Sequence, residues 1–235
     1  MKLELFCLSF FFLPLLGRKE IKGGSKVFSD KYPFIARLEI FTKPKNNRCT
    51  GSLVTKNLIL TAAHCFYNKD GKLYSRGTAT FHDYDFFHTE DNQFTVDMEL
   101  YKDDYGDSDL ALAKLSQDIE DITPVRISKA RVKPGEIFTA VGYGMHGFVR
   151  HGGYDGHLRD AFLDILDVTK NWIVTKLGKN YEGPCAGDSG GPLLARDGSG
   201  WSVVATLKGH GWDCSKNRLD LNYPYGDIWS SVRVM

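Results

Sequence analysis

Residues 185–192 read Cys185-Ala186-Gly187-Asp188-Ser189-Gly190-Gly191-Pro192. Three of the five positions from 187 to 191 are glycine, which indicates a backbone that adopts conformations other residues avoid or that comes close to a ligand. A serine in such a turn can project its hydroxyl outward, and the amides of Gly187 and Ser189 can converge on one point as an oxyanion hole. A tight turn without any chemistry would use the same residues. Ser189 is therefore a candidate nucleophile only if the chain also supplies a base.

The candidate base is His64, which follows a β-like run in the segment Leu60-Thr61-Ala62-Ala63-His64-Cys65. The small residues before it leave room for the imidazole in a cleft, and Cys65 offers a tether for the segment through a disulfide. A single histidine in such a position is more often incidental than catalytic. Its significance depends on the other segments.

The candidate acid is Asp109, which precedes the apolar stretch Leu110–Leu115. An aspartate that opens a strand lies where the chain enters the core, and an unpaired buried carboxylate is very costly. A neutral histidine whose Nδ1–H points at the carboxylate would be a suitable partner. An exposed aspartate at the start of a strand is the ordinary alternative.

Taken together and in chain order, the histidine, aspartate and serine segments resemble the three motifs of the chymotrypsin/trypsin family of serine proteases. The resemblance extends from about Ile21 to Trp229, and Val141-Gly142-Tyr143-Gly144 resembles the family's Gly-aromatic-Gly turn. It implies an all-β fold: two six-stranded antiparallel Greek-key β-barrels with the active site in the cleft between them.

The resemblance also implies a mechanism. His64, Asp109 and Ser189 would form the catalytic triad, and the Gly187 and Ser189 amides would form the oxyanion hole. The chain would then be a secreted serine-type endopeptidase that hydrolyses peptide bonds through an acyl-enzyme. We expect protein or peptide substrates, protein inhibitors as further partners, no cofactor, no metal and a monomeric state.

The composition agrees with one globular, β-rich domain. Of the 235 residues, 42% are hydrophobic and 25% are charged, and the net charge of +1 gives no reason to expect nucleic acid or an anionic membrane as partner. Short apolar runs rich in Val, Ile, Phe and Thr alternate with turn signals such as Asp70-Gly71, which indicates antiparallel strands. The segment Leu158–Trp172 could form an amphipathic helix, but its apolar face is irregular, so we predict β structure there.

The N-terminus has the features of a signal peptide. Lys2 is followed by an apolar run over residues 5–16 and then by Gly17. This run is too short to cross about 30 Å of hydrocarbon as a helix, so we expect no membrane anchor. We assign residues 1–17 to the signal peptide, 18–20 to a short propeptide and 21–235 to the peptidase domain, and we expect a secreted, extracellular protein.

Of the five cysteines, Cys7 would leave with the signal peptide, so four remain in an oxidising compartment. Four cysteines allow three pairings, of which the short loops Cys49–Cys65 and Cys185–Cys214 are favoured. The family resemblance implies the same two disulfides. No C-x-x-C pair occurs, so a zinc site is not favoured, and the acidic stretch over residues 83–91 lacks the ligand spacing of a calcium site.

The resemblance implies synthesis as a zymogen. The segment that begins at Ile21 resembles the new N-terminus of the activated family, so the α-amino group of Ile21 would pair with Asp188 and order the Gly187 amide. An activating protease is therefore an expected partner. Glu20 stands where the family usually has Arg or Lys. This requires an activator specific for acidic residues, trimming after cleavage at Lys19, or a different N-terminus.

By the same resemblance, Gly183 lines the floor of the primary specificity pocket and Asp227 replaces a glycine in its wall. The acidic residue of a trypsin-like pocket is thus absent at position 183, and Asp227 relocates the negative charge. We predict cleavage after Lys or Arg, with bulky apolar side chains accepted too. Lys208 and His210, near the pocket mouth, either contact acidic subsites or belong to a solvated loop, and we favour the loop.

Two other interpretations of the chain remain. The stretch from Gly187 to Gly191 fits G-x-S-x-G, the nucleophile elbow of α/β-hydrolases, which needs a strand–turn–helix and a histidine late in the chain. Pro192 and the scarcity of helices argue against that fold. The second alternative is a catalytically silent homologue that binds proteins. All three triad residues are present, which favours an enzyme.

Overall fold

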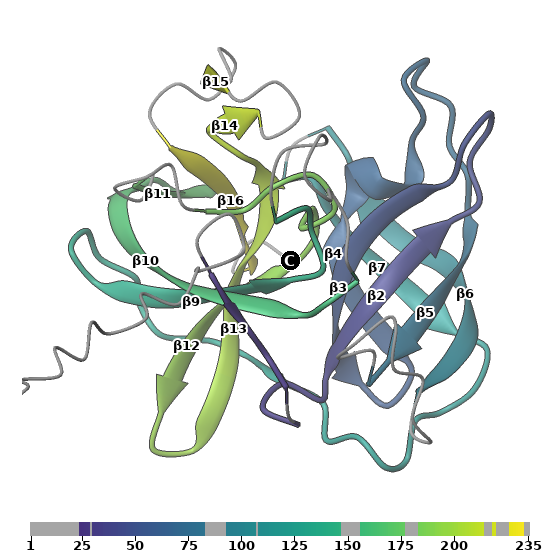
Figure 1. Cartoon of the computed structure of the whole chain (residues 1–235), viewed down its shortest axis with the longest axis horizontal. Coiled ribbons are helices and arrows are strands. Elements are labelled where there is room, and N and C mark those ends of the chain that lie inside the picture. The colour runs from purple at the N-terminus through teal and green to yellow at the C-terminus, as the bar shows by residue number, and fades with distance from the viewer. Residues whose placement is uncertain are drawn as a thin grey trace, which may run out of the picture.

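The computed structural model describes residues 24–28, 30–82, 93–106, 108–146, 156–176, 183–213, 218–219 and 226–232. Within these ranges nearly all regular structure is antiparallel β-sheet, and the one helical element is the 3-10 helix η1 (Ala63–Phe66). The predicted signal peptide 1–17 and propeptide 18–20, together with Ile21, Cys214 and the acidic stretch 83–91, lie outside the described residues. Figure 1 shows the strands gathered into two barrels that lie side by side.

The first barrel contains six strands, which are β2 (Ile35–Ile40), β3 (Asn47–Thr55), β4 (Leu58–Ala62), β5 (Arg76–Phe81), β6 (Phe94–Asp104) and β7 (Leu110–Leu115). They close in the order β2-β3-β4-β7-β6-β5. Every pairing around this barrel is antiparallel. Closure leaves none of these six described strands with a free edge.

The second barrel contains β9 (Ile137–Gly142), β10 (Arg159–Val168), β11 (Trp172–Thr175), β12 (Pro192–Asp197), β13 (Gly200–Gly209) and β16 (Asp227–Ser231). Because β9 pairs with both β10 and β12, the order β9-β10-β11-β16-β13-β12 returns to β9. Four short strands lie outside the barrels: β1 (Ser25–Lys26) on β10, β8 (Arg126–Ile127) on β13, and β14 (Trp212–Asp213) paired with β15 (Arg218–Leu219). The prediction of an all-β fold with two six-stranded barrels is confirmed.

Strand β10 shows how the sequence pattern specifies these barrels. Its Leu163 and Ile165 are buried, whereas Phe162, Asp164 and Leu166 are exposed. This alternation has the period of two residues that places one face of a strand against a core. A helix would instead bury residues three and four positions apart. The prediction of β structure over residues 158–172 is therefore confirmed.

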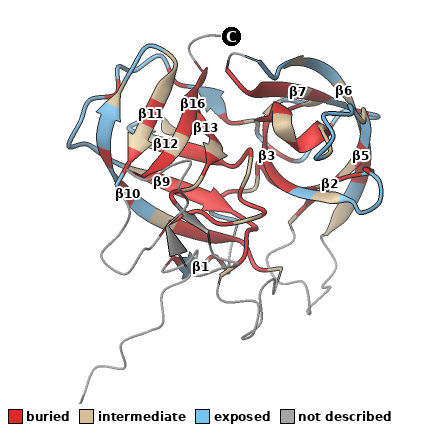
Figure 2. Ribbon diagram, turned by 90° about the horizontal axis from the view of Figure 1, so that it is seen from above, coloured by how far each residue is buried: buried red, intermediate tan, exposed pale blue. Residues whose placement is uncertain are grey.

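The two barrels share a buried apolar contact. One core cluster includes Leu53 and Leu60 from the first barrel together with Val141, Leu194 and Val203 from the second. Figure 2 shows buried residues in the strands of both barrels and where the barrels meet, and exposed residues at the outer ends of the strands. Burial of apolar surface from both sides fixes one barrel against the other, because separating them would return that surface to water. Strands β3 and β4 thereby meet the turn that precedes β12.

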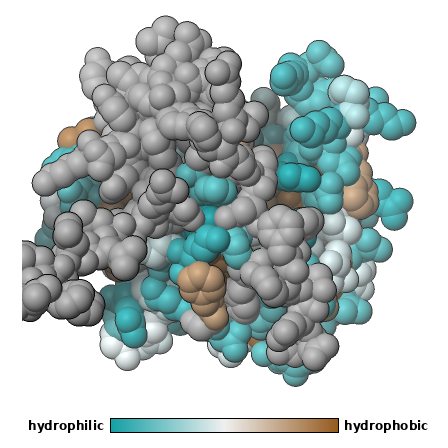
Figure 3. Space-filling view, viewed as in Figure 1, coloured by the Kyte–Doolittle hydropathy of each residue, from teal (hydrophilic) through white to brown (hydrophobic). Residues whose placement is uncertain are grey.

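The described surface in the view of Figure 3 is mostly hydrophilic, with separate hydrophobic residues at the lower centre and at both sides. Scattered apolar residues of this kind are normal on a protein surface. Among the residues that the structure describes, none forms a helix that is long and apolar enough to span a bilayer.

Candidate active site

Strand pairing brings His64 and Asp109 together. Strands β4 and β7 are antiparallel neighbours, and their paired ends are Ala62 and Leu110. His64 lies in η1 just beyond the end of β4, and Asp109 immediately precedes β7. Residues 45 positions apart in the chain therefore meet at one end of the same ladder.

The Asp109 carboxylate holds His64 through both of its oxygens. The His64 backbone N–H donates to Oδ1 at 2.8 Å, and Nδ1 lies 2.8 Å from Oδ2. The Asp109 carbonyl accepts a further bond from the Ala63 amide at 3.1 Å. Asp109 is buried, whereas the His64 side chain keeps 32% of its surface exposed. The carboxylate thus orients the ring, while part of the His64 side chain stays exposed.

Asp109 has an unusual backbone conformation, with φ at 54°. This left-handed region costs most L-residues about 1–2 kcal/mol, although aspartate tolerates it better than larger side chains. The conformation is held by the Asp109 amide, which donates to the Asp104 carbonyl at 2.7 Å. Strained backbone conformations persist only where the surrounding structure holds them, and they are found most often at functional sites.

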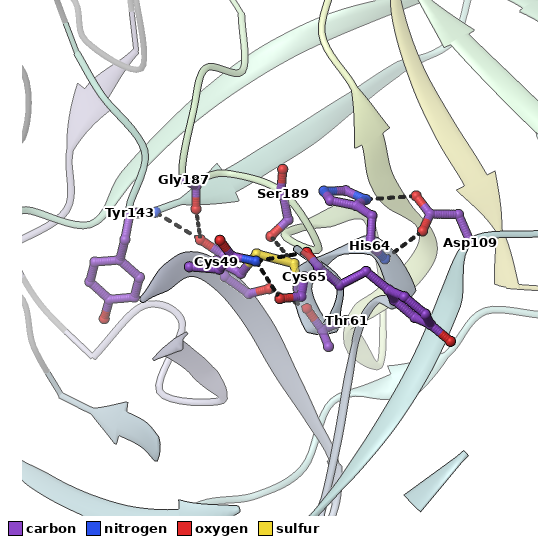
Figure 4. The surroundings of a disulfide bond; sticks show 11 residues. Cys49, Thr61, His64, Cys65, Asp109, Tyr143, Gly187 and Ser189 are labelled. Carbon is purple, nitrogen blue, oxygen red and sulfur yellow. Dashed lines mark hydrogen bonds and ion pairs between the residues drawn. A yellow bond between two sulfur atoms is a disulfide. The ribbon is translucent and has the colours of Figure 1, made fainter. Parts of the chain in front are cut away.

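Ser189 lies in a turn that the first barrel holds in place. The Thr50 amide, on β3, donates to the Ser189 carbonyl at 2.9 Å, and the Thr50 hydroxyl donates to the Gly187 carbonyl at 3.0 Å. The same hydroxyl accepts a bond from the Tyr143 amide at 3.1 Å. Figure 4 shows the His64 imidazole between Ser189 and Asp109. Thr50 therefore links the serine turn to the barrel that carries His64 and Asp109.

Gly190 follows the serine where the chain has no room for a side chain. Its φ is 77°, and a Cβ atom there would lie 2.0 Å from the Thr61 hydroxyl and 2.6 Å from the Thr50 carbonyl oxygen. Both neighbours belong to the first barrel. Glycine at 190 therefore allows the serine turn to approach β3 and β4 closely.

Two amides of the turn are available for a ligand. The amides of Asp188, Gly190 and Gly191 donate to the carbonyls of Cys185, Leu207 and Asp188, at 3.0, 3.0 and 2.7 Å. Within the described part of the chain, the amides of Gly187 and Ser189 have no main-chain acceptor. Gly187 has φ at 98°, a conformation that glycine adopts readily. These are the two donors that the sequence indicated for an oxyanion hole.

The Cys49–Cys65 disulfide joins β3 to η1, next to His64. The three side chains of Cys49, His64 and Cys65 approach within 4.8 Å of one another. Because both sulfurs are in the disulfide, they cannot act as thiolate ligands of a metal. Cys185 is also disulfide-bonded. Its predicted partner, Cys214, lies outside the described residues, so that pairing stays a prediction.

Asp188, between Gly187 and Ser189 in the serine turn, is buried. Its carboxylate accepts bonds from the amides of Gly144 at 2.6 Å and Cys185 at 2.9 Å. Burial raises the pKa of Asp188 to about 6, while the two amides and the positive charge of Arg159 act in the opposite direction. The predicted partner of Asp188, Ile21, lies outside the described residues.

Gly183 and Asp227, which the family resemblance assigns to one pocket, lie next to each other. A Cβ atom on Gly183 would lie 2.9 Å from the Asp227 carboxylate. That carboxylate is fully buried and accepts bonds from the Gly211 amide at 2.8 Å and the Thr175 hydroxyl at 3.4 Å. Burial raises the pKa of Asp227 to about 7, and the negative charge of Asp188 adds to the rise. The Asp227 carboxyl group therefore keeps its proton to a higher pH than an exposed aspartate does.

Lys208 differs from its prediction as a solvated loop residue. It belongs to β13, and its ammonium lies 4.1 Å from the centre of the Trp172 ring, in the geometry of a cation–π contact. The interpretation was wrong because the strand continues to Gly209 and the aromatic partner comes from β11. His210 lies just beyond the strand and is partly buried.

Sequence reasoning did not indicate Thr50 or Arg159. Thr50 is separated from Gly187 by 137 positions, and no local pattern marks it as the residue that holds the serine turn. Arg159 is almost completely buried, which is rare for arginine. Its position beside β9 follows from strand register, which the sequence alone did not provide.

Comparison with known proteins finds related chains over most of this sequence. The family model described as Trypsin matches residues 21–224. The chain is 28% identical over 212 residues to CLIP domain-containing serine protease B10 of Anopheles gambiae, a match that covers 75% of this chain and 59% of that protein. It is 27% identical over 219 residues to granzyme H of Homo sapiens, covering 82% and 84%. It is 28% identical over 196 residues to chymotrypsin-2 of Vespa crabro, covering 74% and 83%.

Proposed function

The chain belongs to the trypsin family of serine proteases, and we propose that it is an active endopeptidase whose catalytic residues are His64, Asp109 and Ser189. The single observation that carries this proposal is the imidazole of His64, which is bound on one side to the buried Asp109 carboxylate and faces Ser189 on the other (Figure 4). A base oriented by an acid beside a hydroxyl is the arrangement that activates a serine nucleophile.

The reaction proceeds in two steps. In the first, the Ser189 hydroxyl attacks the scissile carbonyl carbon, and Nε2 of His64 takes the hydroxyl proton. Asp109 remains ionised and stabilises the positively charged imidazole of His64. The imidazole then gives the proton to the leaving amine. In the second step, water attacks the acyl-enzyme ester with His64 again acting as base, which releases the acid and restores Ser189.

The Gly187 and Ser189 amides stabilise the negative oxygen that forms at each attack. Among the described residues these two amides have no main-chain acceptor, which supports this role, because an N–H already bonded elsewhere would stabilise the oxyanion less. Loss of one donor from such a site typically raises the barrier by about 2.7–4 kcal/mol.

The proposed specificity is for a positively charged side chain before the cleaved bond. Gly183 leaves the pocket floor without a side chain, and Asp227 presents the only carboxylate next to it among the described residues. An ionised Asp227 would pair with Lys or Arg of the substrate. The apolar stems of these side chains and bulky apolar residues would contact the rest of the pocket.

The remaining parts of the proposal concern processing. Residues 1–17 act as a signal peptide for secretion, 18–20 as a propeptide, and 21–235 as the peptidase domain. An activating protease releases the α-amino group of Ile21, which pairs with Asp188. The apolar run over residues 5–16 and the burial of Asp188 support these assignments. Proteins or peptides are the substrates, and protein inhibitors are expected to compete for the same site.

A panel of fluorogenic peptides that differ in the residue before the cleaved bond tests the proposal. We expect hydrolysis after Lys and Arg, some hydrolysis after bulky apolar residues, and none by the Ser189→Ala variant. A folded wild-type protein that cleaves no peptide before or after activation would instead be a silent homologue that binds proteins. Strict cleavage after Asp or Glu would contradict the role given to Asp227.

A further inference from the structure

Arg159 is a buried residue whose positive charge acts on the Asp188 carboxylate. It opens β10, is only 1% exposed, and its guanidinium donates to the His157 carbonyl at 3.2 Å. A buried arginine requires compensation for the loss of water, by hydrogen bonds and by negative charge. Its positive charge acts on Asp188, whose pKa it lowers.

Strand register explains why Arg159 and Asp188 are neighbours. Arg159 is the antiparallel partner of Gly142 on β9. Gly142 and Gly144 both face the Asp188 carboxylate, since a Cβ atom on either would lie within 2.2 Å of its oxygens. Because glycine has no side chain, these two positions leave the space that the Asp188 carboxylate occupies. Arg159 lies on the neighbouring strand, β10.

Before cleavage, a buried and ionised Asp188 needs a positively charged partner other than the Ile21 amine. Until the bond between residues 20 and 21 is cut, the Ile21 nitrogen is an uncharged amide. An ionised carboxylate that is buried without a positive partner is strongly destabilised. The amides of Gly144 and Cys185 bind the carboxylate but carry no net charge.

We propose that Arg159 is an internal counterion for Asp188, a positioning residue that orders the Gly187–Ser189 turn before the Ile21 amine is released. The proposal rests on the function proposed above and concerns the regulation of the same site. The uncut chain should then already have a formed oxyanion hole and measurable reactivity at Ser189. Release of the Ile21 amine adds a second positive partner, so that the contribution of Arg159 becomes smaller after cleavage.

The test compares Arg159 variants in both forms of the chain. A recognition sequence for a specific protease, inserted directly before Ile21, supplies uncut and cut protein from one preparation, each verified by intact mass. The measurement is the second-order rate constant for labelling of Ser189 by a fluorophosphonate. We expect Arg159→Gln to lower this rate about tenfold in the uncut form, which corresponds to about 1.4 kcal/mol. In the cut form the decrease should be less than about twofold.

Two further variants separate positioning from a merely structural role. Arg159→Lys retains the charge and should restore most of the lost rate in the uncut form. Arg126→Gln changes an exposed arginine on β8 that binds Asp197, and should leave the rate unchanged in both forms. Thermal unfolding of every variant shows whether the fold is intact.

The outcomes distinguish this inference from the proposed function. Equal labelling of wild type and Arg159→Gln in the uncut form would overturn the inference, as would equal losses in the uncut and cut forms. The inference would also fail if wild-type protein were labelled only after cleavage, and the proposed function would then still stand. Absence of labelling in both wild-type forms would contradict the proposed function itself.

Discussion

The carboxylate of Asp109 binds His64 twice, through the ring nitrogen Nδ1 and through the backbone amide, each at 2.8 Å. The amide bond fixes the position of the chain at His64, and the ring bond fixes the rotation of the imidazole. A hydrogen bond from Nδ1–H to a carboxylate also selects the tautomer in which Nε2 can accept a proton. One buried side chain therefore determines place, orientation and tautomer of the base.

Replacement of Asp109 by Asn should abolish most activity without unfolding the protein. The amide group of Asn can donate to Nδ1, which would select the tautomer with the proton on Nε2 and leave no base facing Ser189. We expect kcat for peptide hydrolysis to fall by about 10⁴-fold. Asp118→Asn, at an exposed aspartate that binds Asn57, should leave kcat unchanged. If kcat of the folded Asp109→Asn variant fell by less than tenfold, the result would be inconsistent with the proposed triad.

Replacement of Gly190 by Ala should destabilise the protein. The new Cβ atom would lie 2.6 Å from the Thr50 carbonyl oxygen, and φ at 77° is unfavourable for alanine. Overpacking costs about 1–3 kcal/mol and the left-handed conformation about 1–2 kcal/mol, so unfolding in urea should show a loss of roughly 2–5 kcal/mol. Gly198→Ala is the matched control, since nothing lies within 4 Å of its Cβ position. Similar stabilities for the two variants would mean that the serine turn does not pack against β3 as described.

The sequence predicts features that have a local motif, but it does not predict contacts between segments that are far apart in the chain. The fold was predictable because short apolar runs and turn residues specify strands locally, as the alternation in β10 illustrates. The segments that contain His64, Asp109 and Ser189 were visible because each has a local motif. Thr50 and Arg159 have none: their roles depend on the packing of β3 against the serine turn and on the register of β9 with β10. Lys208 was misplaced because Trp172, which its ammonium contacts, lies on another strand.

Cleavage after Lys or Arg should depend on pH through Asp227. Because burial raises the pKa of Asp227 to about 7, the carboxylate gains its charge as the pH rises through neutrality. The ratio of kcat/KM for a Lys substrate to kcat/KM for a Phe substrate should therefore increase between pH 6 and pH 8. The ratio removes the pH dependence of the catalytic step, which both substrates share.

The same ratio, measured in a variant, shows whether Asp227 causes this pH dependence. In Asp227→Asn it should become independent of pH, and kcat/KM for the Lys substrate should fall by a factor corresponding to about 2–5 kcal/mol for the loss of one partner of a buried charge pair. The Phe substrate should be affected much less. A ratio that keeps its pH dependence in Asp227→Asn would assign the specificity to another group.

Asp227 should also make the fold less stable as the pH rises. Its pKa is about 7 in the folded protein and 3.8 in the unfolded reference, so between these values the folded state retains a proton that the unfolded state has lost. Stability therefore decreases as the pH rises from about 4 to about 7, by up to roughly 4 kcal/mol for a shift of this size. The free energy of unfolding of Asp227→Asn, which cannot ionise, should decrease less over that range. Parallel curves for the two proteins in urea titrations at several pH values would show that Asp227 does not titrate as described.

The central claim is tested most directly by reaction with a fluorophosphonate, followed by peptide mapping in a mass spectrometer. This reagent modifies only a serine that a neighbouring base has activated. We predict a single modification, at Ser189, which is lost in His64→Ala while the variant remains folded. A folded wild-type protein, with Ile21 as its verified N-terminus, that stays unmodified or is modified at another serine would contradict the assignment of His64, Asp109 and Ser189 as a catalytic triad.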